Sequence, residues 1–234
     1  MSNLIQFKEK KPKVGIIIQA RMTSTRFPGK SMALLNGKPV LQRVIESALK
    51  IRPQDITIVA VPDTPESEPM LEFMALHKWP ANARLENFCG NELNVLDRYY
   101  EAAKFFKLDV IMRITADCPF IVPKVCSEVL QLLIWRKLDY CSNVHPIRSF
   151  PKGLDCEAFT FDCLEAAHQL AAIDEQEHVT TWMIKTKELK KALVQQQVDA
   201  SDINWCVDNP EDIERLEKIM NDKTKKGAVV ANDQ

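Results

Sequence analysis

The chain of 234 residues is 46% hydrophobic and 27% charged, which provides enough apolar side chains for a buried core and excludes a disordered chain. Its 31 basic and 32 acidic residues give a net charge of -1, which argues against non-specific binding to nucleic acid or to a membrane surface, because such binding requires a dense positive field. The longest apolar runs are too short to cross a bilayer, and the N-terminus lacks the apolar stretch of a signal peptide, so we expect a cytoplasmic protein with neither a membrane nor a nucleic-acid partner.

Cysteine and histidine usage argues against a zinc cluster. The seven cysteines are odd in number and include no CxxC pair, and the four histidines show neither HxxxH nor HExxH spacing. We therefore expect reduced, mostly buried thiols, and we expect any metal to be held by oxygen ligands.

In the first half of the chain, short apolar strands alternate with helical patterns, which is typical of a three-layer α/β domain. A long loop over 21–39 follows the first strand, and the stretch around Pro80, Asn82 and Gly90 is predicted to be irregular. The pattern predicts strands over 14–20, 56–61 and 110–114, and helices over 40–51, 66–76, 93–106 and 122–135.

The second half is more mixed. Asp162 is predicted to cap one helix, and Pro210 lies in the first turn of the last helix, which opens at Asp208. The pattern predicts strands over 140–142, 157–161, 193–197 and 205–207, and helices over 162–170, 175–185 and from 208 onward. One domain over 13–221 is expected, with mobile polar tails over 1–12 and 222–234.

The loop after the first predicted strand carries three cations, Arg21, Arg26 and Lys30, together with Ser24 and Gly29. The carboxyl end of a central strand is the place where open α/β sheets bind ligands. Arginine forks, a lysine point charge and main-chain amides together suit a polyphosphate. The alternative is a solvated basic loop. Because the chain has neither a Walker motif nor GxGxxG, it gives no support to an ATPase or a dehydrogenase.

Two aspartates follow later predicted strands. Asp117 comes just after the strand over 110–114, and Asp208 just after the strand over 205–207. Carboxylates facing phosphate-binding cations indicate a Mg²⁺ ion between protein and phosphate oxygens. The alternative is structural: Asp117 would begin a turn before Pro119, and Asp208 would cap the last helix.

The segment Gln19-Ala-Arg-Met-Thr-Ser-Thr-Arg-Phe-Pro-Gly-Lys30 closely resembles the signature of the CMP-sugar synthetases, of the CMP-KDO and acylneuraminate type. The spore-coat polysaccharide cytidylyltransferase branch is more similar still. Ala116 departs from the family, which usually has glycine before the aspartate. Further resembling segments recur in order at 37–39, 95–100, 113–119, 153–157, 177–180 and 207–212.

The resemblance implies a nucleotide-diphosphosugar-transferase fold, which is a Rossmann-like α/β/α arrangement around a mixed, mostly parallel sheet. It implies transfer of CMP from CTP to an acidic keto-acid sugar for surface polysaccharide, with release of pyrophosphate and with Mg²⁺, or Mn²⁺ in its place. By the family motif, Arg21, Lys30 and Asp117 are catalytic, and Asp117 and Asp208 bind the metal.

The resemblance also implies the remaining binding residues and a homodimer whose contacts lie within about 140–190. Arg98 is either a contact to the base or a structural ion-pair residue. Acceptor contacts are expected from Arg148 and Lys152 to a carboxylate, and from Glu157 and His178 to hydroxyls; His178 is otherwise a capped or core histidine. The nucleotide-binding residues are expected to be Gln19, Ala20, Arg21, Ser24, Arg26, Lys30, Asp97 and Arg98.

Two other functions stay open at this point. One is a nucleotidyltransferase that joins another NTP to a phosphorylated sugar or polyol, although that family typically opens with a GxGxR loop and this chain reads ARxxSTRxPxK. The other is a non-catalytic nucleotide-binding protein on the same fold.

Overall fold

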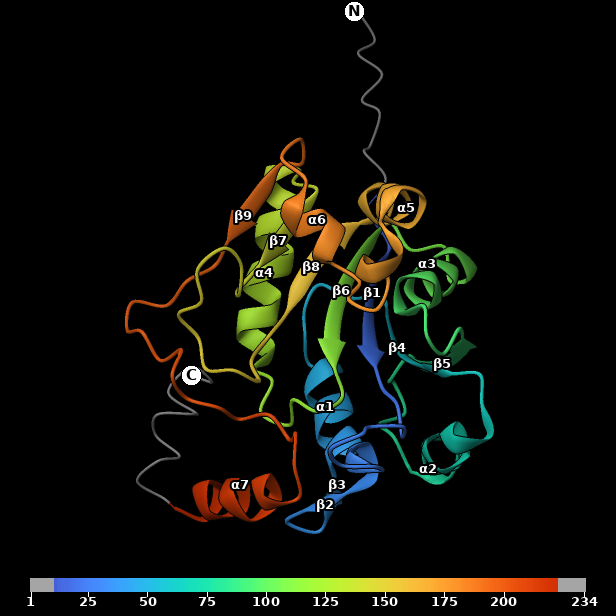
Figure 1. Cartoon of the computed structure of the whole chain (residues 1–234), viewed down its shortest axis with the longest axis vertical. Helices are drawn as coiled ribbons and strands as arrows, with labels where there is room; N and C mark the ends of the chain where they lie inside the picture. Colours follow the sequence, from blue (N-terminus) through green and yellow to red (C-terminus); the bar gives the residue numbers. More distant parts are fainter. Residues whose placement is uncertain (1–10, 223–234) are drawn as a thin grey trace, which may run out of the picture.

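The computed structural model describes residues 11–222. Within them, a seven-stranded sheet has the strand order β5-β4-β1-β6-β8-β7-β9 (Figure 1). A two-stranded hairpin, β2 with β3, lies outside this sheet. The strands are β1 (Val14–Gln19), β2 (Leu34–Leu35), β3 (Lys38–Pro39), β4 (Ile56–Pro62), β5 (Leu85–Gly90), β6 (Val110–Thr115), β7 (Tyr140–Ser142), β8 (Glu157–Thr160) and β9 (Lys191–Leu193).

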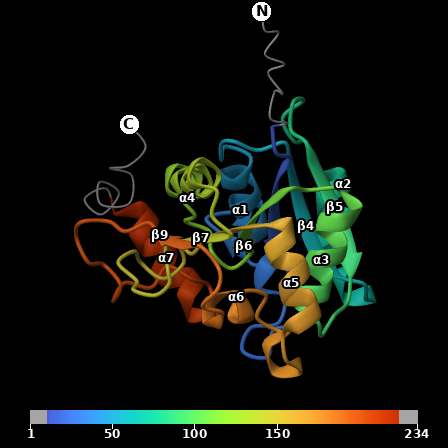
Figure 2. The same cartoon turned by 90° about the horizontal axis from the view of Figure 1, so that it is seen from above.

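Helices cover both faces of the sheet, with α1 and α4 on one face and α3 and α5 on the other (Figure 2). The strands β5, β4, β1 and β6 run parallel, whereas β8 is antiparallel to both β6 and β7. The predicted three-layer fold with a mixed, mostly parallel sheet is therefore confirmed. The helices are α1 (Val40–Ala48), α2 (Glu68–Leu76), α3 (Val95–Phe105), α4 (Pro123–Arg136), α5 (Phe161–Leu170), α6 (Thr181–Lys185) and α7 (Glu211–Asn221).

The central strand β1 shows why this sheet is double-sided. Ile16 and Ile18 belong to the core that α1, α2, α4 and α7 share, and Ile17 belongs to the core under α3, α5 and α6. Alternate side chains of a strand point to opposite faces, so a strand covered on both faces must be apolar at every position. Because the neighbouring strands are parallel, their carboxyl ends lie together at one edge, which is the lower edge in Figure 1.

Two local predictions, one for a strand and one for a helix cap, are wrong. The stretch predicted to be irregular contains β5, a partly exposed strand that pairs with β4. Because β5 lies at the edge of the sheet with only one neighbouring strand, its composition is polar and shows no strand pattern. The predicted cap of α5 was Asp162, but Thr160 caps that helix: its hydroxyl accepts a hydrogen bond from the backbone N–H of Cys163 at 3.2 Å.

The second half departs further from its predicted elements. The helix expected over 175–185 is split into a short 3-10 turn, Ile173–Glu175, and the five-residue α6. The strand expected over 193–197 is β9, which lies earlier. No strand forms over 205–207. The preceding residue, Asn204, forms only an isolated β-bridge with Lys152.

The cysteines follow their prediction: every cysteine is free, Cys89 is exposed and the other six are buried. Among residues 11–222, no helix has the length and apolarity needed to span a membrane. The predicted tails fall outside the described residues except for Lys11, Pro12 and Asp222.

Candidate active site

The basic loop leaves the carboxyl end of β1 and folds back over the sheet edge. Gly29 adopts a φ of +76°, a conformation that glycine reaches at little cost, and its N–H donates to the carbonyl of Met22 at 2.9 Å. The hydroxyl of Ser31 donates to the carbonyl of Arg21 at 3.1 Å. These contacts close the loop, and Lys30 is thereby directed toward the strand ends.

Lys30 joins the two aspartates that the sequence singles out. Its Nζ lies 2.6 Å from Oδ2 of Asp117 and 3.4 Å from Oδ1 of Asp208, and it donates to the carbonyl of Val207 at 3.0 Å. The Lys30 side chain is only 12% exposed, so this contact is weakly screened by solvent. The structure thus brings together three residues that are 87 to 178 positions apart in the chain.

The carboxyl group of Asp117 is held in its ionised form. Burial by itself would raise its pKa, but the charge and hydrogen bond of Lys30, together with hydrogen bonds from Thr115 and Cys118, outweigh burial and leave the pKa of Asp117 below its ordinary value. Asp117 also accepts a backbone hydrogen bond through its carbonyl from the N–H of Val207 at 2.9 Å, which ties the two aspartate-bearing segments together.

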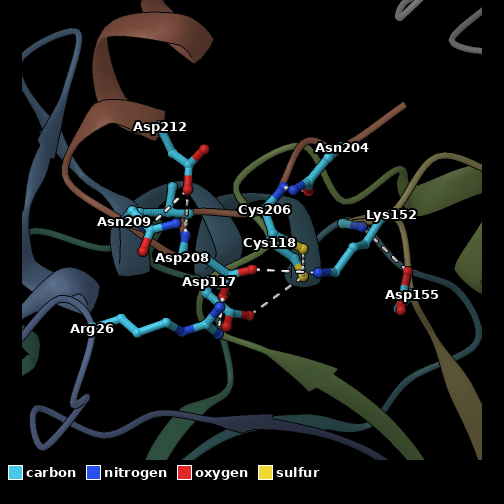
Figure 3. Close-up of polar contacts among 12 residues, drawn as sticks. Arg26, Asp117, Cys118, Lys152, Asp155, Asn204, Cys206, Asp208, Asn209 and Asp212 are labelled. Carbon is cyan, nitrogen blue, oxygen red and sulfur yellow. Dashed lines mark hydrogen bonds and ion pairs between the residues drawn. The ribbon is translucent and has the colours of Figure 1, made fainter. Parts of the chain in front are cut away.

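Asp208 precedes α7 and is oriented by a residue that the sequence analysis did not single out. The carboxylate of Asp212 accepts hydrogen bonds from the N–H groups of Asp208 and Asn209, each at 2.8 Å (Figure 3). Arg215 in turn donates to Asp212 at 2.7 Å. The signal was present in the sequence as a carboxylate three and four residues after the N–H groups that it caps.

Two further cations reach Asp208 from opposite sides (Figure 3). The Nη2 of Arg26 lies 3.2 Å from Oδ1, and the Nζ of Lys152 lies 3.4 Å from Oδ2. Arg26 is 65% exposed and Lys152 is 50% exposed, so both side chains are open to a ligand. One sheet edge therefore carries three cations around two carboxylates.

The segment that carries Lys152 packs tightly against the segment before Asp208. The N–H of Lys152 donates to Ile203 at 2.8 Å, and the N–H of Trp205 donates to Lys152 at 2.7 Å. Gly153 has a φ of +100°, and a Cβ there would lie 2.8 Å from the backbone carbon of Trp205. Only glycine allows this close approach without a shift of the backbone.

The two carboxylates fit a magnesium ion that also binds a nucleotide. No group of three or more metal-binding side chains occurs in residues 11–222, so the chain offers no complete protein cage. Mg²⁺ is typically held by one or two carboxylates together with substrate phosphates and water. Asp117 and Asp208 converge on one point, now occupied by the Lys30 ammonium group, and this arrangement fits the protein share of such a site.

Arg98 lies in α3 and is fully buried, with 0% exposure, although its Nε, Nη1 and Nη2 have no hydrogen-bond partner in the described residues. Burial lowers the pKa of its guanidinium, and the charge of Arg21 lowers it further. A buried, unpartnered guanidinium is unfavourable. The ion-pair interpretation of Arg98 finds no partner in the described part of the chain, whereas a ligand-binding interpretation accounts for the free donors.

The other predicted nucleotide contacts are spread over the same edge. Ala20 is buried and its N–H donates to Ala60 at 3.1 Å, and the hydroxyl of Ser24 accepts from the N–H of Phe27 at 3.4 Å. Arg21 is 46% exposed and lies 3.9 Å from Glu177. Asp97 pairs instead with His168, with 3.0 Å between Oδ1 and Nε2.

The predicted acceptor contacts divide into two open and two engaged side chains. Lys152 lies at the site, and His178 is exposed with no side-chain partner in residues 11–222. Arg148 is engaged with both oxygens of Asp155, at 2.6 and 2.8 Å. Glu157 is 4% exposed and its two oxygens are also occupied. Arg148 and Glu157 therefore do not present the free groups that were expected to contact the acceptor.

The site is an open edge located by its charged groups. A hollow of about 940 Å³ lies elsewhere, near the amino ends of β4 and β5, and Lys50, Trp79 and Arg84 are among its lining residues. No predicted site residue lines that hollow.

A family model described as cytidylyltransferase matches residues 15–233. The chain belongs to the cytidylyltransferase family. It is 28% identical over 226 residues to the Bacillus subtilis spore coat polysaccharide biosynthesis protein SpsF, covering 93% of this chain and 90% of that protein. It is 33% identical over 122 residues to the 3-deoxy-manno-octulosonate cytidylyltransferase of Geobacter metallireducens, covering 52% of this chain and 45% of that protein.

The fold agrees with this assignment. A solved cytidylyltransferase structure from Leptospira borgpetersenii superposes with a TM-score of 0.82 at 25% identity, covering 96% of this chain and 99% of that one. The resemblance to the cytidylyltransferases is confirmed, and the protein is a cytidylyltransferase.

Proposed function

We propose that this cytidylyltransferase transfers CMP from CTP to an acidic keto-acid sugar, releases pyrophosphate, and supplies the activated sugar for surface polysaccharide. The observation that carries the proposal is the convergence of Lys30, Arg26 and Lys152 on Asp117 and Asp208 at one sheet edge. The names of the spore-coat and octulosonate relatives support the polysaccharide context and the acidic acceptor.

On the nucleotide side, the cations have a ready function. Arg21, Arg26 and Lys30 bind the triphosphate, and each now lies near a carboxylate that a phosphate group would replace as its partner. Asp117 and Asp208 hold Mg²⁺, which when bound neutralises part of the triphosphate charge.

In the reaction, a hydroxyl oxygen of the acceptor forms a bond to the α-phosphorus and gives its proton to water, while the bond between the α-phosphorus and the oxygen that bridges the α- and β-phosphates breaks. The electron pair of that bond leaves with pyrophosphate, so negative charge grows on the leaving group. Three contacts hold Lys30 at the strand ends in the ligand-free protein, so its positive charge already lies at the site where it would stabilise the leaving group in the transition state.

Arg98 provides the base contact in this proposal, and because its donors are buried in the ligand-free protein, the side chains that cover them must move when CTP binds. A guanidinium only donates hydrogen bonds, in a rigid fork. Cytosine offers two adjacent acceptors, O2 and N3, whereas the N3 of uracil carries a hydrogen. The free donors of Arg98 therefore favour cytosine over uracil.

For the acceptor, Lys152 pairs with the sugar carboxylate and His178 contacts its hydroxyl groups. Both side chains are open, whereas Arg148 and Glu157 support the surrounding wall through their internal contacts. The chain functions as a homodimer in this proposal, and exposed apolar side chains within the predicted contact region support that, namely Ile147, Leu170 and Ile173. Sedimentation velocity checks the dimer directly.

The experiment that tests the function is a pyrophosphate-release screen. Each of CTP, UTP, GTP and ATP is combined with keto-acid sugars and, separately, with phosphorylated sugars and polyols, in the presence of Mg²⁺. We expect release only with CTP and a keto-acid sugar. Release with a phosphorylated acceptor would replace the proposed acceptor class, and no release with any pair would contradict the proposal.

A further inference from the structure

Arg113 forms a charged network inside the sheet, although it is not among the predicted site residues and has no role in the proposed function. It lies on β6, and its Nη1 donates to Oε2 of Glu157 on β8 at 2.6 Å. The hydroxyl of Tyr140 on β7 donates to the other oxygen, Oε1, at 2.5 Å. Three adjacent strands thus fix the guanidinium in one orientation.

This network is set in apolar surroundings. The Arg113 and Glu157 side chains are only 18% and 5% exposed, and Ile111 and Phe159 beside them on the same strands belong to the core under α3 and α5. A buried ion pair often contributes no more to stability than apolar residues of the same size would. Stability is therefore a weak explanation for its presence, and its position near the site favours a functional one.

The remaining contact of Arg113 points to that function. Its Nη2 lies 3.5 Å from Oε1 of Gln19, the last residue of β1 and the first of the basic-loop segment. Gln19 is partly exposed, and in residues 11–222 its Nε2 has no hydrogen-bond partner. Since Nε2 of Gln19 has no partner but is not buried, solvent or a ligand can reach it.

We propose that Arg113 is a positioning residue of the active site: it binds the side-chain oxygen of Gln19 and so directs the amide nitrogen of Gln19 outward as a donor to the nucleotide. An amide has one accepting and one donating end, and a guanidinium can contact only the accepting end. Glu157 and Tyr140 hold Arg113 in place for this contact. The group of the nucleotide that meets Gln19 must then be a hydrogen-bond acceptor, such as a phosphate or carbonyl oxygen.

This inference rests on the proposed function, because CTP is the ligand that Gln19 contacts. The test is Gln19→Glu, which keeps the shape and the contact to Arg113 but places an oxygen where the outward N–H₂ group was. We expect the Tm to stay the same or rise, and the Kd of CTP with Mg²⁺, measured by calorimetry, to increase about tenfold or more. Gln131→Glu, at an exposed position of α4, adds the same charge as a matched control and should leave Kd unchanged.

A double-mutant cycle separates positioning from a direct contact. Arg113→Lys should weaken CTP binding in the wild-type background but add little once Gln19→Ala is present, because the lysine acts through a side chain that is gone. Arg84→Lys, at an exposed position, is the matched control. If Arg113→Lys does not fold, the Gln19→Glu measurement decides alone.

The outcomes distinguish the two proposals. If the wild-type protein binds CTP and Gln19→Glu binds it equally well, Arg113 does not orient Gln19 and this inference is wrong while the proposed function stands. Additive losses in the cycle would overturn it in the same way. If the wild-type protein neither binds CTP nor releases pyrophosphate, the proposed function itself fails.

Discussion

The ammonium group of Lys30 has three partners, and its removal is the most direct test of whether the basic loop binds phosphate. Lys30→Met keeps the apolar stem and deletes the charge. We expect kcat to fall on the order of a hundredfold or more, as for other preorganised charge-stabilising donors, and CTP affinity to fall much less. Steady-state kinetics beside calorimetry measures both. A variant with wild-type turnover would contradict the role of Lys30.

The same contact predicts a pH dependence. Lys30 lowers the pKa of folded Asp117, so Asp117 stabilises the fold fully above its unfolded pKa, near 3.8, and this stabilisation is lost as the pH falls through the lower folded value. In Lys30→Met, the charge and hydrogen bond of Lys30 no longer oppose burial, so the pKa of Asp117 should rise even though the hydrogen bonds of Thr115 and Cys118 remain. Thermal melts between about pH 2 and pH 6 span the ordinary aspartate pKa. In these melts the acid destabilisation of Lys30→Met should begin at a higher pH than that of the wild-type protein. Identical acid profiles would show that Lys30 does not control Asp117.

Replacing Arg98 should increase the stability of the protein and weaken its binding of CTP. Its guanidinium is fully buried without a partner in the described residues, so Arg98→Met removes an unfavourable group. We expect the free energy of unfolding to rise by about 1–3 kcal/mol and CTP affinity to fall about tenfold or more. Urea unfolding and calorimetry test the pair. A variant that loses stability but keeps CTP affinity would indicate that Arg98 is structural.

At residue scale, the sequence was informative where a side chain follows a buried strand. Lys30 and Asp117 were found in this way, because carboxyl ends of parallel strands meet at one edge. Arg148 and Glu157 were placed less well, because their partners, Asp155 and Arg113, depend on loop closure and strand pairing that local patterns do not specify.

Among the elements, buried strands were predicted well and edge segments poorly. The apolar runs of β1, β4 and β6 can be recognised in the sequence, because helices cover these strands on both faces. The polar strand β5 cannot, because it has one neighbouring strand and faces solvent, so its sequence has no hydrophobic pattern. Residues 205–207 look like a strand by composition, yet they lack a continuous partner to pair with.

The close contact at Gly153 gives a prediction for these segments. Gly153→Ala combines a left-handed backbone with a Cβ 2.8 Å from the backbone of Trp205, so it should displace the segment that leads to Asp208. Gly37→Ala is the matched control: its φ is +71° but nothing lies within 4 Å of a Cβ. The control should lose about 1 kcal/mol from backbone strain alone. Gly153→Ala should lose more stability and also raise the Kd of CTP; equal losses in the two variants would contradict the packing argument.

For the molecule as a whole, a net charge of -1 conceals a local separation of charges. The sheet edge gathers its cations from the loop after β1 and from Lys152, and its carboxylates from the ends of β6 and the segment before α7. In the ligand-free protein the two carboxylates, Asp117 and Asp208, offset most of the charge of the three cations around them, Arg26, Lys30 and Lys152. In the proposed function, nucleotide binding therefore exchanges partners among charged groups that already lie together.

That exchange predicts how metal removal acts on the entire protein. Because Lys30 already lies between Asp117 and Asp208, EDTA should leave the Tm of the ligand-free protein unchanged. CTP with Mg²⁺ at a hundred times its Kd should raise the free energy of unfolding by about 2.7 kcal/mol. EDTA should abolish this Tm shift along with activity, and Mg²⁺ or Mn²⁺ should restore both. Asp117→Asn and Asp208→Asn should fold but show neither the shift nor the restoration. The same CTP-induced shift in EDTA, or full activity there, would show that these two carboxylates do not hold a catalytic metal.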